Sequence, residues 1–425
     1  MVIGDLEILF AQHPEIALGR SELQKGRNPH VLFSGLYASA RALALSAYAK
    51  EGQIVIMDNS EAAQYLYGDL KTIGVNVQFF SSSKHRRTVD DAAVIQRTEC
   101  LAALGNLSSS SSCQEGRFPI IVTYPEAMTE EVPAKEQLSS LTLTLKTGQE
   151  IQQSELRDRL SEFGFEHVDF VFQPGQYAVR GSIVDIYSYS HDNPYRLDFF
   201  GDEIESIREF DIEDQLSKSK VETAEIVGNL PSDNGIAHSI VDYIPEDFIW
   251  VSNDFSVVRF KLDSSSVPLY NGTKWQHFFE SHKSIEIAEK STFQTHSKIT
   301  FDTLPQPVFH KQFDILMDDI KRHTEEGYKI YILAEQKKQL DRLAAIFDSL
   351  SSDGESVSFI GINATLHEGF VDHRMKICCY TDHQIFERYH RVTLSSENAR
   401  RGKAIITLRE INQLQVGDYV VHSDH

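Results

Sequence analysis

Apolar positions in the first 140 residues follow two different spacings. Short apolar runs, typical of buried strands, alternate with apolar positions three or four residues apart, which are typical of one face of a helix. The predicted strands lie at 31–33, 54–57, 75–79 and 119–123, and the predicted helices lie at 40–49 and from residue 62 onward. Because strands that alternate with helices form a parallel sheet covered by helices, this part of the chain predicts an α/β domain.

The spacing changes from about residue 141. Leu156, Leu160 and Phe163 fall on one face of a predicted helix, which Ser154 caps and Gly164 ends. Runs of alternating apolar and polar residues then follow at 167–172, 176–179, 182–187, 195–200 and 203–210, with turn residues between them. This order predicts an antiparallel meander with one helix.

A second α/β pattern begins near residue 313, after a segment with mixed spacings that includes a predicted strand at 248–251. The predicted elements are helices at 313–323 and 337–350, a strand at 328–333, and strands near 359 and at 375–380. The polar, basic stretch 395–403, with Arg400, Arg401 and Lys403, is typical of a solvated linker.

The net charge of the chain bears on whether it binds proteins or nucleic acids. The chain has 62 acidic and 41 basic residues and a formal charge of -21, which repels phosphate backbones. We therefore expect protein partners before DNA. Asp5 and Glu7 stand where a secretory signal carries basic residues, and no apolar stretch is long enough to span a membrane, so we expect a cytoplasmic protein.

The sequence predicts no metal site. The four cysteines form no CxxC pair and no Cys/His zinc spacing. His383 and His390 flank Glu387, but seven residues on one helix would place the two imidazoles two turns apart. We therefore expect both histidines on the surface and no bound metal.

A strand, loop and helix beginning at residue 31 match the place and length of a phosphate-binding loop, GxxxxGK[ST], without its chemistry. Gly35 holds the first glycine position, but Ala40 replaces the second, Arg41 replaces the lysine, and Ala42 replaces the hydroxyl that binds magnesium. A side chain at residue 40 would hinder the approach of phosphate oxygens to the backbone. We therefore expect no nucleotide hydrolysis and no catalytic residue.

Two further observations bear on this loop. The strand at 248–251 continues as Ser252-Asn253-Asp254, without the Asp-Glu pair that activates metal and water in an ATPase. A dinucleotide-binding alternative would use Asp58 for the ribose, but Tyr37 and Ala40 do not fit the glycine fingerprint, so a helix cap or loop carboxylate is the simpler interpretation of Asp58.

Residues 171–211, VFQPGQYAVRGSIVDIYSYSHDNPYRLDFFGDEIESIREFD, closely resemble the UvrB-homology domain of the bacterial transcription-repair coupling factors. GLYASARAL, from residue 35, resembles the degenerate phosphate loop of that family, and LQVGDYVVHSDH, 414–425, resembles the start of its RNA-polymerase-interacting domain. In that family the UvrB-like domain binds UvrA, the next domain binds RNA polymerase, and a C-terminal motor uses ATP and magnesium to translocate on DNA. No motor motif occurs in this sequence.

The resemblance implies an α/β multidomain fold. Residues 1–140 and 229–308 would form two parts of a degenerate P-loop, RecA-like parallel-sheet domain. Residues 141–228 would form an inserted α+β antiparallel domain that binds UvrA, residues 309–394 a smaller α/β domain, and residues 395–425 a linker and the truncated start of the RNA-polymerase-interacting domain. The expected function is a scaffold that recruits UvrA to stalled RNA polymerase in transcription-coupled nucleotide excision repair, with no cofactor and with DNA contacted only through the missing motor.

The candidate docking residues lie on the predicted strand 195–200. Alternation places Tyr195, Leu197 and Phe199 in the core and Arg196, Asp198 and Phe200 on the other face. By the resemblance, Arg180, Arg196 and Phe200 match family positions that contact UvrA. The alternative is structural: Arg180 braces the adjacent turn, and Arg196 pairs with Asp198 or Glu203 on a solvated face.

Two other functions stay open at this point. An active nucleotide-dependent, UvrB-like helicase or excinuclease subunit would need a working loop at Gly35 and would hydrolyse ATP. A direct DNA binder would need a local concentration of basic residues against the charge of -21 and would bind with a strong dependence on salt.

Overall fold

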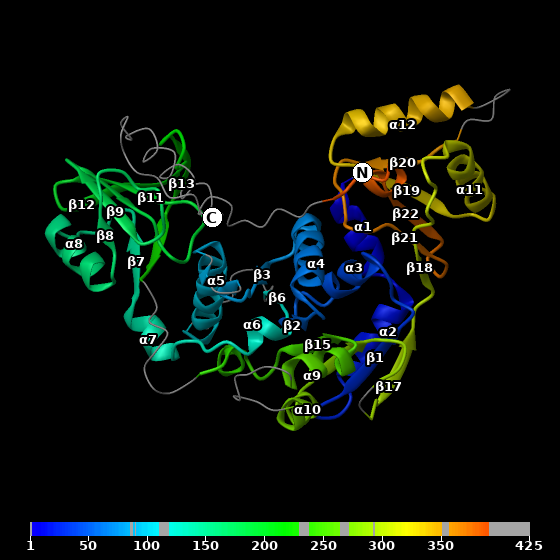
Figure 1. Ribbon diagram of the computed structural model, residues 1–425, viewed down its shortest axis with the longest axis horizontal. Coiled ribbons are helices and arrows are strands. Elements are labelled where there is room, and N and C mark those ends of the chain that lie inside the picture. Colours follow the sequence, from blue (N-terminus) through cyan, green and yellow to red (C-terminus); the bar gives the residue numbers. More distant parts are fainter. Residues whose placement is uncertain are drawn as a thin grey trace, which may run out of the picture. The chain divides into compact units, whose positions relative to one another are not determined.

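The structure is a computed structural model, and it describes residues 2–85, 88–89, 91–109, 119–228, 238–263, 272–291, 294–350 and 357–390. The basic cluster at Arg400, Arg401 and Lys403 and the motif 414–425 lie outside the described residues. The described residues form two compact units: unit 1 comprises those within 1–81, 107–130 and 239–393, and unit 2 comprises those within 82–106 and 131–238 (Figure 1).

The first sheet of unit 1 has seven parallel strands in the order β17-β1-β16-β15-β2-β6-β3. Its strands are β1 His30–Ser34, β2 Gln53–Ile56, β3 Val77–Phe79, β6 Ile120–Thr123, β15 Ile249–Asn253, β16 Ser284–Ile287 and β17 Ser297–Thr300. The central strands are buried on both faces because helices cover the sheet. This confirms the predicted parallel α/β sheet.

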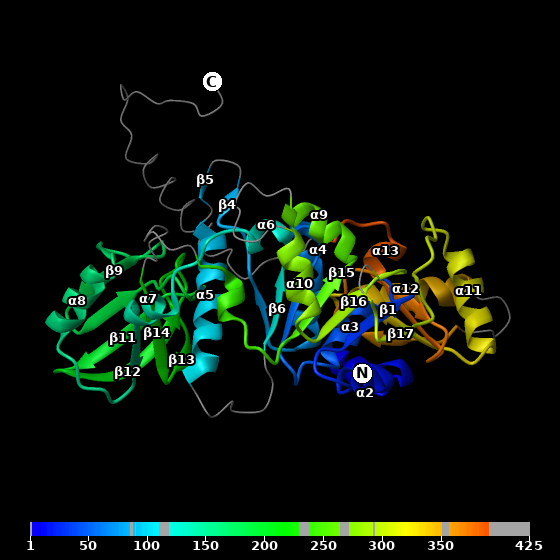
Figure 2. The same ribbon diagram turned by 90° about the horizontal axis from the view of Figure 1, so that it is seen from below.

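The helices that accompany this sheet are α1 Ile3–Phe10, α2 Pro14–Leu23, α3 Ala40–Ser46, α4 Ser60–Ile73, α6 Pro125–Met128, α9 Phe255–Asp263 and α10 Gly272–Glu280, together with the 3-10 helix η1 Ile240–Tyr243. Helices α9 and α10 lie side by side next to β15 (Figures 1 and 2). Trp250 on β15 contacts Phe278 and Phe279 on α10 edge to face, which joins these helices to the sheet.

The second sheet of unit 1 has five strands in the order β18-β21-β22-β19-β20. Its elements are β18 Thr303–Pro305, β19 Lys329–Leu333, β20 Ile360–Ile362, β21 Phe370–Asp372 and β22 Ile377–Thr381, with helices α11 Phe313–Glu325, α12 Lys337–Leu350 and α13 Asp382–Ile385. Strands β22, β19 and β20 run parallel, and β18 and β21 are antiparallel to their neighbours. Leu316 and Ile320 of α11 and Leu343 and Phe347 of α12 pack in its core.

Unit 2 contains a six-stranded sheet in the order β13-β12-β11-β10-β9-β8 and a separate antiparallel pair of β7 and β14. Its elements are β4 Lys84–His85, β5 Thr88–Val89, α5 Asp91–Ser109, α7 Lys135–Ser140, β7 Thr142–Lys146, α8 Gln153–Glu162, β8 Glu166–His167, β9 Gln176–Arg180, β10 Ile183–Ile186, β11 Tyr195–Phe200, β12 Glu203–Phe210, β13 Ser217–Val221 and β14 Thr223–Val227. Leu156 and Leu160 of α8 lie in the main core with Leu197 and Ile207 of the sheet. The helix and most of the meander are therefore as predicted, but the predicted cap is wrong: α8 begins at Gln153, so Ser154 lies inside the helix and Gln152 precedes it without a side-chain cap.

The predicted strand at 167–172 is wrong. Only Glu166–His167 forms a strand, β8, and it pairs parallel with β9, so the sheet is not wholly antiparallel. Residues 168–172 instead form a segment whose Val171 is fully buried beside Ala178, Tyr187, Phe210 and Ile212. Val168 and Val171 of this segment pack over the sheet and do not extend it as a further strand.

The α/β, multi-sheet fold class is confirmed, and several short strands were not foreseen. Among the helices that the structure describes, none combines the length and the apolar character needed to cross a bilayer.

Candidate functional site

The outer face of β11 carries the candidate docking residues. Tyr195, Leu197 and Phe199 are buried in the main core of unit 2, as predicted from their alternation. Arg196, Asp198 and Phe200 lie on the opposite face, although the pairing of β11 with β12 shifts register between Asp198 and Phe199. The strand therefore presents a basic, an acidic and an aromatic side chain on one side.

Arg196 is held by a carboxylate on the neighbouring strand. Asp185 of β10 is the direct register partner of Arg196, and its side chain is fully buried. Arg196 donates from Nε to Asp185 Oδ1 at 2.8 Å and from Nη2 to Asp185 Oδ2 at 2.9 Å. This hydrogen-bonded carboxylate raises the pKa of Arg196. The pairing partner is therefore Asp185, and neither Asp198 nor Glu203, the partners considered from the sequence, takes that place.

Arg180 reaches the same carboxylate from the other side. It forms an ion pair with Asp185 through Nη2 and donates from Nη1 to the carbonyl oxygen of Asp169 at 2.9 Å. Its guanidinium also lies over the ring of Phe170, 5.0 Å from the ring centre. Arg180 therefore ties the 168–172 segment to the sheet, and it does so through Asp185 and Asp169 rather than by bracing only the turn that follows it.

A small second core lies beneath these arginines on the outer face of the sheet. Arg196 lies 4.4 Å from the ring centre of Phe210, a member of that core, and donates from Nη1 to the carbonyl oxygen of Gln215 at 2.9 Å. Gln215 has a left-handed backbone, with φ of 61°, which turns its carbonyl toward the guanidinium. One end of this sheet face is thus covered by the protein's own loops, whereas the sequence had predicted an open face.

Phe200 is the exposed part of the face. It is 78 % exposed at the end of β11, directly before the turn at Gly201, whose φ is 64°. Its register partner is Glu203, which is also exposed. An aromatic ring with so little contact to its own domain has a large apolar area available for a protein partner.

The segment that resembles a phosphate loop is closed by the protein's own groups. The amide of Gly35 donates to Glu289 Oε1 at 3.3 Å, and the amide of Tyr37 donates to Thr303 Oγ1 at 2.9 Å. Gly35 has φ of 68°, and a Cβ there would collide with the carbonyl oxygen of Phe301. The tyrosine hydroxyl of Tyr37 also donates to Glu289 at 2.6 Å, which lowers the pKa of Glu289.

The two alanines in the second half of this loop have no polar side-chain atom to offer to a phosphate or a metal. Ala40 and Ala42 are fully buried in α3. The Nε of Arg41 donates to the carbonyl oxygen of Leu36 at 3.0 Å, within its own loop, and burial lowers the pKa of Arg41. A nucleotide phosphate would have to displace the Glu289 carboxylate and Thr303 before it reached the loop amides.

The carboxylates beside this loop have structural partners. Asp58 follows β2 and accepts from Asn253 Nδ2 at 2.9 Å, and burial raises the pKa of Asp58. Asp254 accepts from the amide of Ser256 at 3.1 Å at the start of α9, as a helix-capping residue does. Of the two roles considered for Asp58 from the sequence, the loop carboxylate is the one observed, since Asn59 caps α4.

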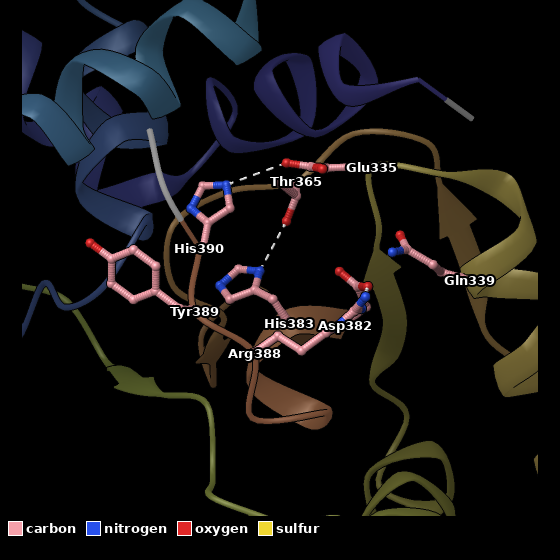
Figure 3. Close-up of a pocket in the computed structure, with 8 residues that line it drawn as sticks. All are labelled: Glu335, Gln339, Thr365, Asp382, His383, Arg388, Tyr389 and His390. Atoms are coloured by element: carbon pink, nitrogen blue, oxygen red, sulfur yellow. Dashed lines mark hydrogen bonds and ion pairs between the residues drawn. The ribbon is translucent and has the colours of Figure 1, made fainter. Parts of the chain in front are cut away.

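A polar pocket of about 220 Å³ lies where β19, β20 and β22 end (Figure 3). It is lined by Glu335, Gln339, Thr365, Asp382, His383, Arg388, Tyr389 and His390. The rings of His383 and His390 are stacked with their centres 4.6 Å apart. The prediction that these two histidines lie far apart on the surface is wrong, because α13 ends at Ile385 and Glu387 adopts a left-handed backbone that turns the chain back.

Both ring nitrogens of His383 have partners within the fold. His383 Nδ1 lies 3.3 Å from Thr365 Oγ1, and His383 Nε2 lies 2.8 Å from the carbonyl oxygen of His367. Burial lowers the pKa of both His367 and His383 to about 4. Among the residues that the structure describes, no group of three His, Cys, Asp or Glu side chains is arranged to hold a metal ion. Sequence spacing missed this cluster because its members come from separate strand ends.

The chain is similar to known proteins in one segment and over most of its length. Residues 143–230, which run from β7 to β14 and omit only Thr142 of β7, match the UvrB interaction domain family. Over 93 % of its length the chain is 22 % identical to a transcription-repair-coupling factor of Bacillus subtilis and to one of Staphylococcus aureus. The chain spans 41 % of the length of each of these relatives. Residues 143–230 are thus similar to UvrB interaction domains, and the chain as a whole is similar to one region of the longer transcription-repair-coupling factors.

Proposed function

We propose that this chain is a docking scaffold that recruits UvrA to stalled RNA polymerase in transcription-coupled nucleotide excision repair, and that it does not hydrolyse nucleotide. The observation that carries the proposal is the surface at Phe200, where an aromatic ring that is 78 % exposed follows a strand whose arginine is fixed in place. Aromatic and arginine side chains are the types most often responsible for binding energy at protein interfaces. The match to a UvrB interaction domain supports UvrA as the partner.

Arg180 and Arg196 bring side chains that are already fixed in position, as well as positive charge, to the docking face. Arg180 and Arg196 share Asp185, so neither guanidinium has to be immobilised when a partner arrives. Association is weakened by each flexible side chain that has to be ordered, by about 0.5–1.5 kcal/mol. A surface that is already ordered avoids that cost, which favours docking over a purely solvated role for these residues.

Titration calorimetry of the whole chain with purified UvrA tests the proposal. Phe200→Ala should weaken binding by about 2 kcal/mol, close to thirtyfold in Kd, because the ring is lost at the centre of the contact. The ring has few contacts within its own domain, so the unfolding temperature should not change. Phe260→Ala is the matched control, since Phe260 is 73 % exposed on α9 of unit 1. Equal affinity of UvrA for the wild type and the Phe200 variant would refute the assignment.

The absence of nucleotide hydrolysis is supported by the loop at Gly35. Two of its amides are taken by Glu289 and Thr303, and Ala42 replaces the hydroxyl that would bind magnesium. We infer that this chain needs no cofactor and works in the cytoplasm, and that contacts with DNA and most contacts with RNA polymerase belong to regions of the longer relatives that this chain does not span. A UvrB-like, nucleotide-dependent enzyme is the competing function, and magnesium-dependent hydrolysis of ATP by the purified chain would favour it instead.

A further inference from the structure

Three basic side chains lie in one row across the outer face of the six-stranded sheet. Arg196 on β11 is the direct register partner of Arg208 on β12, and Arg208 is the direct register partner of Lys220 on β13. Asp185 on β10 completes the row at its other end. Direct partners on neighbouring strands have their side chains about 5 Å apart, so the three charges act on one another.

This arrangement costs stability in the isolated chain, because like charges directly opposite each other on neighbouring strands repel. Asp185 offsets the charge of Arg196, and Asp198 forms an ion pair with Arg208. Lys220 is exposed, and within the described part of the chain it has no ion pair. The row therefore keeps an excess of positive charge at its β12 and β13 end, in a chain whose formal charge is -21.

We propose that the docking face continues from β11 over β12 and β13, and that Arg208 and Lys220 receive carboxylates of the protein partner, whose matching surface is acidic. This inference rests on the proposed function, since it extends the same face. The row is continuous with the Phe200 surface through Arg196 and Asp198 on β11. A nucleic acid fits the face less well, because it would meet the net negative charge of the chain and would gain little from the exposed ring.

The charge reversal Lys220→Glu separates binding from stability. It places a carboxylate opposite Arg208, so the unfolding temperature should stay equal or rise by about 1–2 °C. The association rate constant with UvrA, measured by stopped-flow at low salt, should fall about tenfold, since charges at the edge of an interface act mainly on the encounter of the partners. If Lys220 had only a structural role, the substitution would lower the unfolding temperature and the association rate constant together.

Lys146→Glu is the matched control, because Lys146 is an exposed lysine of unit 2 on β7, outside the six-stranded sheet, and its reversal changes the net charge equally. Arg208→Gln should weaken association as Lys220→Glu does, and both variants should show a flatter dependence on salt than the wild type. If Lys220→Glu and Lys146→Glu bind UvrA at the wild-type rate while Phe200→Ala binds weakly, the extension of the face is overturned and the proposed function stands.

Two further outcomes test the proposed function itself and the choice of a protein over a nucleic acid as the partner. A wild-type chain that does not bind UvrA overturns the proposed function and this inference with it. Binding of a duplex oligonucleotide that both Arg208→Gln and Lys220→Glu weaken, but Lys146→Glu does not, overturns the assignment of the row to a protein partner.

Discussion

Replacing Asp185 by asparagine should destabilise unit 2 by about 2 kcal/mol. Asp185 accepts hydrogen bonds from Arg180 and Arg196, and its side chain is fully buried. Removing one partner of a buried ion pair costs roughly 3–5 kcal/mol when the remaining charge stays buried. The side chains of Arg180 and Arg196 are 34 % and 15 % exposed, so water can solvate them in part, and the asparagine oxygen can still accept one hydrogen bond.

The measurement has to report on unit 2 alone. Trp250 and Trp275, the two tryptophans of the sequence, both belong to unit 1, so tryptophan fluorescence would not follow the effect. Amide hydrogen exchange of β10 and β11 should show protection reduced by the same free energy, because the loops that Asp185 anchors also cover one face of the sheet.

Asp198→Asn is the control for this prediction. Asp198 and Arg208 form a more exposed pair, with side chains 22 % and 39 % exposed, so its loss should cost about 0.5 kcal/mol. Exchange in the Asp185 variant that equals the wild type, or an equal loss in both variants, would show that the shared carboxylate does not anchor the loops.

Three further predictions concern unit 1, where tryptophan fluorescence during urea unfolding is a suitable measurement. Gly35→Ala should cost about 3 kcal/mol, since the new Cβ meets a backbone carbonyl and φ is 68°. Asp69→Ala should cost about 2 kcal/mol, since this buried carboxylate accepts from Ser39 Oγ at 2.6 Å and from the amide of His367 at 2.6 Å. Burial lowers the pKa of His383 from 6.5 to about 4 in the folded protein, so between these pH values the unfolded chain binds more protons at this residue. The contribution of the neutral His383 ring to the free energy of unfolding is therefore complete above pH 6.5 and is lost as the pH falls toward 4. The stability difference between the wild type and His383→Gln should therefore shrink on acidification by about 2 kcal/mol, and a difference independent of pH would contradict the burial of the neutral ring.

Much of the candidate site could be predicted from local patterns. The alternation along 195–200 placed Leu197 in the core and Phe200 outside, because a strand with one buried face fixes the direction of every side chain. The departures at Ala40 and Ala42 likewise predict a loop without phosphate chemistry, since those positions need a glycine and a hydroxyl, and this stays a prediction. Both conclusions depend on residues that are near one another in the chain.

The remaining features depend on contacts between distant residues. Asp185 gave no signal, because its role comes from two arginines that reach it from different strands. Val171 lies in an apolar run that is equally typical of a strand and of a covering loop, so local spacing could not separate the two. The stacking of His383 on His390 required a reversal of the chain at Glu387, which no helical spacing includes.

The carboxylate shared by Arg180 and Arg196 limits how substitutions at these positions can be interpreted. When either arginine is removed, the other keeps Asp185 to itself and gains freedom to rearrange around it. Losses of affinity in the two single variants should therefore not add up to the loss in the double variant, and only a full thermodynamic cycle can separate a direct contact from a redistributed one.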